Sequence, residues 1–300
     1  MKIKGLVGLT CISPLLITPL VSCRKNTATT PEIKVILMAG QSNMEGHDAS
    51  WNLDYTNTKG ETFYKLEDHT VRDYRAGHDN VKIDYDCTYA RRIDPSQEPN
   101  SSHGEFVNVD FGYGRDTDHF GPEVGFAKYL GEHDHNQTYY IIKSAEGSSG
   151  LYNDWSETGH CYQTFVEDVK IGIENIKKLH KSFKICGFVW MQGEEDAQKE
   201  EQAPNYKNNM INLLDRISTN FSQYYIDDGL TIVDGGISTK GSSEDYAIVN
   251  QAKKELASAY TRYQYVSLSE RLSMVNEWHY TNTGYLALGE AFGSAYLDIN

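Results

Sequence analysis

Runs of apolar and β-branched residues recur from residue 33 onward, and they are separated by segments with helical spacing. Within these runs the apolar residues are continuous rather than alternating, which is typical of strands in a parallel sheet covered on both faces. The runs predict strands over residues 34–38, 139–142, 185–190, 230–233 and 265–268.

The segments between these runs carry apolar residues at the three- and four-residue spacing of amphipathic helices. Such stripes lie within residues 165–176, 206–217, 249–259 and 282–292. Pro122 and Pro204 stand where the first turn of a helix tolerates proline. Strands that alternate with helices predict a three-layer α/β/α sandwich with a central parallel sheet, in the flavodoxin-like manner. Catalytic groups are then expected at the carboxyl ends of the strands.

The stretch 48–120 breaks this alternation, because it is polar, rich in Tyr, Asp and Gly, and shows no clear period. We expect a long insertion after the first strand that lies over the edge of the sheet and forms part of a substrate cleft.

Composition narrows the class of partner. The 300-residue chain carries a formal net charge of -14, which argues against nucleic acid and against anionic membrane surfaces as partners. The 21 tyrosines are compatible with sugar binding, but tyrosine is also an ordinary core residue.

The first residues resemble an export signal. Lys2 and Lys4 precede an apolar segment, Leu6–Val21, that is too short and too interrupted by proline to span a membrane. The sequence LVSC at residues 20–23 resembles the lipobox of bacterial lipoproteins, in which Cys23 becomes the lipidated first residue. We therefore expect a signal peptide over 1–22, a polar tether over 23–31 and one domain over 32–300, anchored by lipid in the cell envelope. The alternative is a plain secretory signal.

Two of the five cysteines lie in the expected signal peptide and lipobox. The other three are Cys87, Cys161 and Cys186. One disulfide is compatible with an oxidising envelope, but their spacing selects no pairing. Because no Cys-x-x-Cys pair is present, we expect neither a cysteine-based metal site nor a redox dithiol.

Three segments carry candidate chemistry. Ser42 follows the first strand, residues 190–196 (WMQGEED) follow the third, and His279 precedes the last helix. All three are expected at one edge of the sheet. A serine hydroxyl needs a base, and histidine is the natural base near neutral pH. On position alone, Ser42 is better explained as a helix N-cap.

Together the blocks resemble the carbohydrate-esterase branch of the SGNH hydrolases, which includes acetylxylan esterases and sialate O-acetylesterase-like proteins. The likeness covers most of residues 33–297. It rests on GQSNM at 40–44, GPEVGFA at 121–127, IKSAEGSS at 142–149, QGEED at 192–196, and HYT at 279–281 with Gly284. The Gly-x-Ser-x-Gly elbow of α/β-hydrolases is absent, which fits this branch.

The resemblance implies a serine esterase that removes acetyl groups from carbohydrates. His279 would take the proton of Ser42, which attacks the ester carbonyl and forms an acyl-serine intermediate. The oxyanion would be met by the N–H groups of Ser42 and Gly147 and by the amide of Gln192. No metal and no organic cofactor is implied.

One position departs from the family pattern, which has Asp three residues before the histidine. Asn276 stands there, and an amide cannot stabilise an imidazolium as a carboxylate does. Glu194 is the first candidate for the missing acid and Glu277 the second. A Ser–His dyad of reduced activity, or an inactive site, is the remaining interpretation.

Two other functions stay open at this point. One is deacylation of a lipid or thioester, which the polar insertion disfavours. The other is a non-catalytic, glycan-binding surface lipoprotein, which Asn276 alone supports.

Overall fold

The computed structural model describes residues 32–49, 74, 78–85, 102, 104–116, 119–242 and 244–299. They belong to one compact unit, Pro31–Asn300. Cys23 and Cys87 lie outside the described residues, as does most of 48–120.

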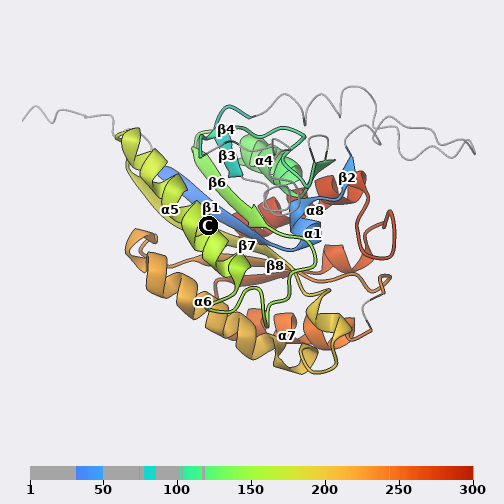
Figure 1. Cartoon of the computed structure of the whole chain (residues 1–300). Helices are drawn as coiled ribbons and strands as arrows, with labels where there is room; N and C mark the ends of the chain where they lie inside the picture. Colours follow the sequence, from blue (N-terminus) through green and yellow to red (C-terminus); the bar gives the residue numbers. More distant parts are fainter. Residues whose placement is uncertain are drawn as a thin grey trace, which may run out of the picture. The chain divides into compact units, whose positions relative to one another are not determined.

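A seven-stranded sheet of order β4-β3-β6-β1-β7-β8-β9 forms the centre of the described unit (Figure 1). Its strands are β1 Ile33–Gly40, β3 Val81–Tyr85, β4 Val107–Asn108, β6 Tyr139–Ala145, β7 Phe183–Met191, β8 Thr231–Gly235 and β9 Tyr263–Val266. All neighbours pair in parallel except β3 and β4. The five predicted strands are confirmed, although β9 begins and ends two residues earlier than the predicted 265–268.

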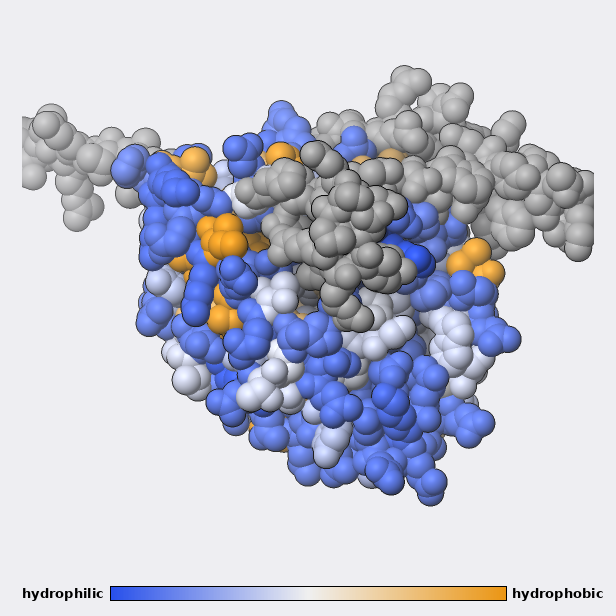
Figure 2. All heavy atoms as spheres, viewed as in Figure 1, coloured by the Kyte–Doolittle hydropathy of each residue, from blue (hydrophilic) through white to orange (hydrophobic). Residues whose placement is uncertain are grey.

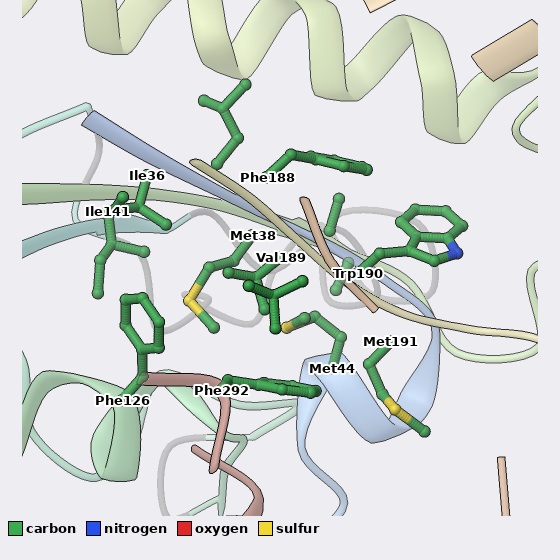
Figure 3. Packing of buried hydrophobic residues seen from close by; sticks show 14 of the residues in the cluster. Ile36, Met38, Met44, Phe126, Ile141, Phe188, Val189, Trp190, Met191 and Phe292 are labelled. Carbon is green, nitrogen blue, oxygen red and sulfur yellow. The ribbon is translucent and has the colours of Figure 1, made fainter. Parts of the chain in front are cut away.

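Helices cover both faces of the sheet (Figure 1). The longer ones are α4 Glu123–His133, α5 His160–Lys178, α6 Tyr206–Phe221, α7 Tyr246–Ala259 and α8 Asn282–Leu297. Short 3₁₀ turns lie at Asp196–Gln198, Ala203–Asn205, Ser222–Tyr224 and Ser267–Arg271. Alternate residues of β7 point to opposite faces, as a strand requires (Figure 3). Trp190 lies on the face covered by α5 and α6, where its Nε1 donates to the Tyr206 hydroxyl, whereas Met191 lies on the opposite face, where it and Phe292 of α8 both pack against Gly235. The predicted α/β/α sandwich is confirmed.

The structure corrects part of the expectation for the segment 48–120. It was expected to lie over the sheet edge, but its strand β3 pairs in parallel with β6 and extends the sheet itself. Two further short strands, β2 Asp48–Ala49 and β5 His119–Phe120, pair with each other at the two ends of the segment.

Two close approaches of backbone depend on glycine. A Cβ on Gly40 would lie 2.0 Å from the carbonyl oxygen of Met191, so only glycine lets the ends of β1 and β7 meet. A Cβ on Gly289 of α8 would lie 2.0 Å from the carbonyl oxygen of Pro122, which lets α8 pack closely on the start of α4.

The described surface in the same view is mainly hydrophilic, with small separate apolar patches (Figure 2). None of the helices in the described ranges is long and apolar enough to cross a membrane. No disulfide joins Cys161 to Cys186, and both side chains are buried.

Candidate active site

Ser42 begins the short helix α1, Ser42–Glu45, directly after the turn that ends β1. Gln41 donates its N–H to the carbonyl of Met191, and its own carbonyl accepts the N–H groups of Met44 and Glu45. The first N–H groups of a helix have no partner within the helix. The backbone N–H of Ser42 therefore has no partner inside α1, and it lies at the carboxyl edge of the sheet.

The neighbouring Asn43 is a fully buried residue that the sequence did not single out. Its Nδ2 donates to Oε1 of Glu194 at 2.6 Å and to the carbonyl of Trp278 at 3.0 Å. Its Oδ1 accepts the N–H of Tyr280 at 3.2 Å and the hydroxyl of Tyr285 at 3.0 Å. One amide thus joins the segment of Ser42 to the segments of Glu194 and His279, which confirms that the three blocks meet.

The His279 ring is oriented by Asn276. Nδ2 of Asn276 lies 3.1 Å from Nδ1 of the ring. Oδ1 of the same amide accepts the N–H groups of Trp278 at 2.8 Å and of His279 at 2.9 Å. Because a carbonyl oxygen must face two N–H donors, the amide cannot be turned the other way without losing both bonds.

This orientation determines the proton position on the ring. The Asn276 NH₂ group can only donate, so Nδ1 must accept, and a neutral ring then carries its hydrogen on Nε2. A base that takes the serine proton through Nε2 needs the opposite tautomer. In the geometry of the structure, Asn276 therefore favours the non-catalytic tautomer of His279.

A second histidine, which the sequence also missed, lies against the first. The rings of His47 and His279 stack with centroids 4.3 Å apart. Nε2 of His47 lies 2.8 Å from Oε2 of Glu45, a buried carboxylate. Burial, and then positive charge at His47 and Arg115, lowers the pKa of His279 from 6.5 to about 3. The ring is therefore neutral at neutral pH but a weak base.

Ser42 and His279 line the same cavity, which has a volume of about 280 Å³. Its other lining residues are mainly polar: Gln41, Ser148, Glu194, Glu195, Gln198 and Trp278. No hydrogen bond joins the Ser42 hydroxyl to the His279 ring among the described contacts. Such bonds are often long before substrate binds and tighten in the complex.

The other two predicted oxyanion donors are engaged elsewhere. The N–H of Gly147 donates to Oε2 of Glu45 at 3.0 Å. The Gln192 amide donates one hydrogen to the carbonyl of Ser149 and the other to Oδ2 of Asp196. Their oxyanion role stays a prediction, and it requires these hydrogen bonds to open.

The two candidate acids lie in different surroundings. Glu194 is buried and lines the cavity, and burial raises its pKa despite the hydrogen bond from Asn43. Glu277 is exposed, and its carboxylate accepts from the Ser242 hydroxyl at 3.1 Å. Glu277 is therefore not placed to orient His279. The role of Glu194 as the acid stays a prediction, since the partner seen at Nδ1 is Asn276.

The lowered pKa of His279 predicts a pH-dependent stability. The folded ring stays neutral down to about pH 3, whereas the unfolded ring takes a proton below about pH 6.5. Stability contributed by the neutral ring is thus complete above pH 6.5 and falls as pH drops toward 3. We expect His279→Gln to remove this part of the acid destabilisation, on the order of 1 kcal/mol between about pH 7 and about pH 4.5 for a partly exposed ring. Urea unfolding at the two pH values measures it, and an equal decline in both proteins would contradict the lowered pKa.

Solved structures with the same fold are similar to this chain at low identity. A protein from Arabidopsis thaliana is 18% identical with a TM-score of 0.62, over 90% of this chain and 99% of that one. NanS is 12% identical with a TM-score of 0.61, over 90% and 98%. XAC1771, a carbohydrate acetylesterase from Xanthomonas citri, is 14% identical with a TM-score of 0.54, over 89% and 56%. No curated protein sequence matches the chain.

The model of a sequence family matches residues 32–298, nearly the whole described unit. Its description is carbohydrate esterase, sialic acid-specific acetylesterase. The chain belongs to this family of carbohydrate esterases, and it is a carboxylic ester hydrolase that acts on O-acetyl groups of carbohydrates.

Proposed function

We propose that the chain removes acetyl groups from a carbohydrate through an acyl-serine intermediate, with Ser42 as nucleophile and His279 as base. The observation that carries this proposal is the shared cavity of about 280 Å³, which both the first residue of α1 and the His279 ring line. A nucleophile and a base in one small cavity are the minimum that ester hydrolysis needs.

The reaction proceeds in two halves. Oγ of Ser42 attacks the acetyl carbonyl while Nε2 of His279 takes the hydroxyl proton, and the N–H of Ser42 donates to the oxyanion. The protonated ring then gives its proton to the departing sugar oxygen. Water deprotonated by the same ring attacks the acetyl-serine and releases acetate.

The cavity lining supports a sugar rather than an acyl chain as the leaving group. Glu195 and Gln198 offer hydroxyl-binding groups, and the half-buried Trp278 offers an aromatic face on which a sugar ring can stack. A lipid would need an apolar cleft, which these residues do not supply.

Removal of the nucleophile is the direct test. Ser42→Ala is expected to abolish acetate release from an aryl acetate and from acetylated xylan or acetylated sialic acid, because no acyl-enzyme can form. The wild-type protein measured in parallel shows which ester is cleaved. An unchanged rate in Ser42→Ala would contradict the assignment of Ser42. Binding of the glycan without any release by wild-type protein would favour the non-catalytic alternative.

We also propose that Asn276 limits the rate, because it holds the ring in the wrong tautomer. An Asp at this position would keep one oxygen on the N–H groups of Trp278 and His279 and turn the other toward a protonated Nδ1. Asn276→Asp is therefore expected to raise kcat at least about tenfold. The ceiling is about 10⁴, the loss seen for the reverse exchange in serine proteases.

A carboxylate introduced by Asn276→Asp would also raise the pKa of His279, so the acidic limb of the pH–rate profile should move to higher pH. Glu277→Gln is the matched control, since that carboxylate lies at the surface on Ser242. A folded Asn276→Asp protein with unchanged kcat would contradict the tautomer proposal while leaving Ser42 as nucleophile.

For location, we propose a lipid anchor at Cys23 in the bacterial cell envelope. The support is the sequence alone, namely the lipobox-like LVSC at residues 20–23 after an apolar segment. Cys23→Ser is expected to move the protein from the detergent-soluble membrane fraction to the soluble envelope fraction. Wild-type and Cys23→Ser proteins both found in the soluble envelope fraction would indicate a plain secretory signal.

A further inference from the structure

A cluster of three different metal-binding side chains lies outside the catalytic cavity. Glu146 directly follows β6, and His160 and Cys161 are the first two residues of α5. One carboxylate oxygen, one ring nitrogen and the sulfur all lie within 4.8 Å of one another. The sequence predicted no cysteine-based metal site, because its spacing contains no Cys-x-x-Cys pair.

A carboxylate and a thiol converge on a single ring nitrogen. Nε2 of His160 lies 2.9 Å from Oε1 of Glu146 and 3.3 Å from Sγ of Cys161. A ring nitrogen carries at most one hydrogen, so a protonated Nε2 donates to the carboxylate and cannot also accept from the thiol. An unprotonated Nε2 could accept the thiol hydrogen but would face the carboxylate lone pairs. All three atoms can instead act as ligands of one cation placed between them.

The opposite side of the ring has the partner that metal-binding histidines use. Nδ1 of His160 lies 3.6 Å from Oδ1 of Asp154. This distance is longer than a hydrogen bond, but the negative charge of Asp154 still favours a hydrogen on Nδ1, which leaves the Nε2 lone pair for a metal. Asp154 is itself held, because its Oδ2 accepts the N–H of Gly150 at 2.8 Å.

The donor set and its dimensions fit Zn²⁺. Zinc accepts sulfur, imidazole nitrogen and carboxylate oxygen together, with bonds of about 2.0–2.3 Å and tetrahedral angles. Such bonds place ligand atoms about 3.3–3.8 Å apart. The separations of 2.9 and 3.3 Å therefore need only a small opening. Glu146 and Cys161 are buried, while the His160 side chain is 47% exposed and leaves a path for the ion.

We propose that Glu146, His160 and Cys161 form a binding site for a zinc-like divalent transition metal, with Asp154 holding the His160 ring. On binding, the Cys161 thiol loses its proton to solvent and the thiolate sulfur bonds to the metal, with no change in oxidation state. The site fixes the start of the loop 146–149, whose Ser148 lines the catalytic cavity. It supplies no step of ester hydrolysis, and its existence does not depend on the role of Ser42.

Metal titration of the purified full chain tests the site. The chain is first treated with a chelator and kept anaerobic, and Zn²⁺ or Co²⁺ is then added. We expect about one metal per chain and a Co²⁺ spectrum with a thiolate charge-transfer band. Cys161→Ser and His160→Gln should each weaken Zn²⁺ binding at least about tenfold, and Asp154→Asn about 10- to 100-fold. Cys161→Ser should also abolish the thiolate band.

His135→Gln is the matched control, because this exposed histidine lies outside the cluster and should leave binding unchanged. His160 is half exposed, so His160→Gln still decides the question if Cys161→Ser fails to fold. Zn²⁺ binding no tighter than about 0.1 mM would overturn the proposal. The same holds if binding and the Co²⁺ spectrum are unchanged in a folded His160→Gln or Cys161→Ser protein.

Discussion

The four hydrogen bonds of the Asn43 side chain are the constraint on which the catalytic edge depends. Asn43 is fully buried, and its partners lie 151 to 242 residues away along the chain. A buried amide that loses one hydrogen-bond partner destabilises the fold by about 1–3 kcal/mol. Displacement of any of the bonded segments is therefore unfavourable. This bonding fixes where Glu194, the Trp278 carbonyl and the Tyr280 N–H lie relative to Ser42. The position of His279 follows, because its two chain neighbours are held.

The hydrogen bonds of Asn43 position His279, but they do not make its ring a strong base. Burial and nearby positive charge lower the pKa of the ring to about 3, and its Nδ1 faces an amide rather than a carboxylate. A ring with this pKa gains little from taking a serine proton, since proton transfer is most effective when the pKa lies near the working pH. The chain thus has the fold of its family, and the base proposed to serve Ser42 is weakened. The role of Glu194 as the compensating acid stays a prediction, since the contact seen for its Oε1 is the Asn43 amide.

Much of this arrangement could be predicted from the sequence, and the failures have physical reasons. The buried parallel strands were predictable because a short continuous apolar run such as 185–190 is typical of a strand covered on both faces. The strand Val81–Tyr85 was missed because its VKIDY pattern alternates and stands within a polar stretch. The segments of Ser42 and Glu194 were predictable because they follow strands, and that of His279 because it directly precedes the last helix.

Contacts that depend on side-chain direction were not predictable. The sequence around Asn43 and His47 does not indicate their roles. The partners of Asn43 are far away along the chain, and His47 contacts His279 through a ring stack that no sequence pattern reveals. The orientation of the Asn276 amide follows from two backbone N–H groups that only the turn at residues 276–279 brings together. The Glu146–His160 pair is separated by 14 residues, far more than the roughly two to five residues between the paired ligands of common zinc motifs.

The loop 146–149 connects these separate features. Glu146 belongs to the metal-binding cluster, the Gly147 N–H is held by Glu45, and Ser148 lines the cavity with a left-handed backbone at φ 58°. A non-glycine residue in that conformation persists only where its surroundings over-determine it. Donation by Gly147 to an oxyanion requires its bond to Glu45 to open, and Glu45 also holds His47 against the catalytic ring. The position of this loop therefore links the donor for the oxyanion to the electrostatics of the base, and any ligand that fixes Glu146 acts on both.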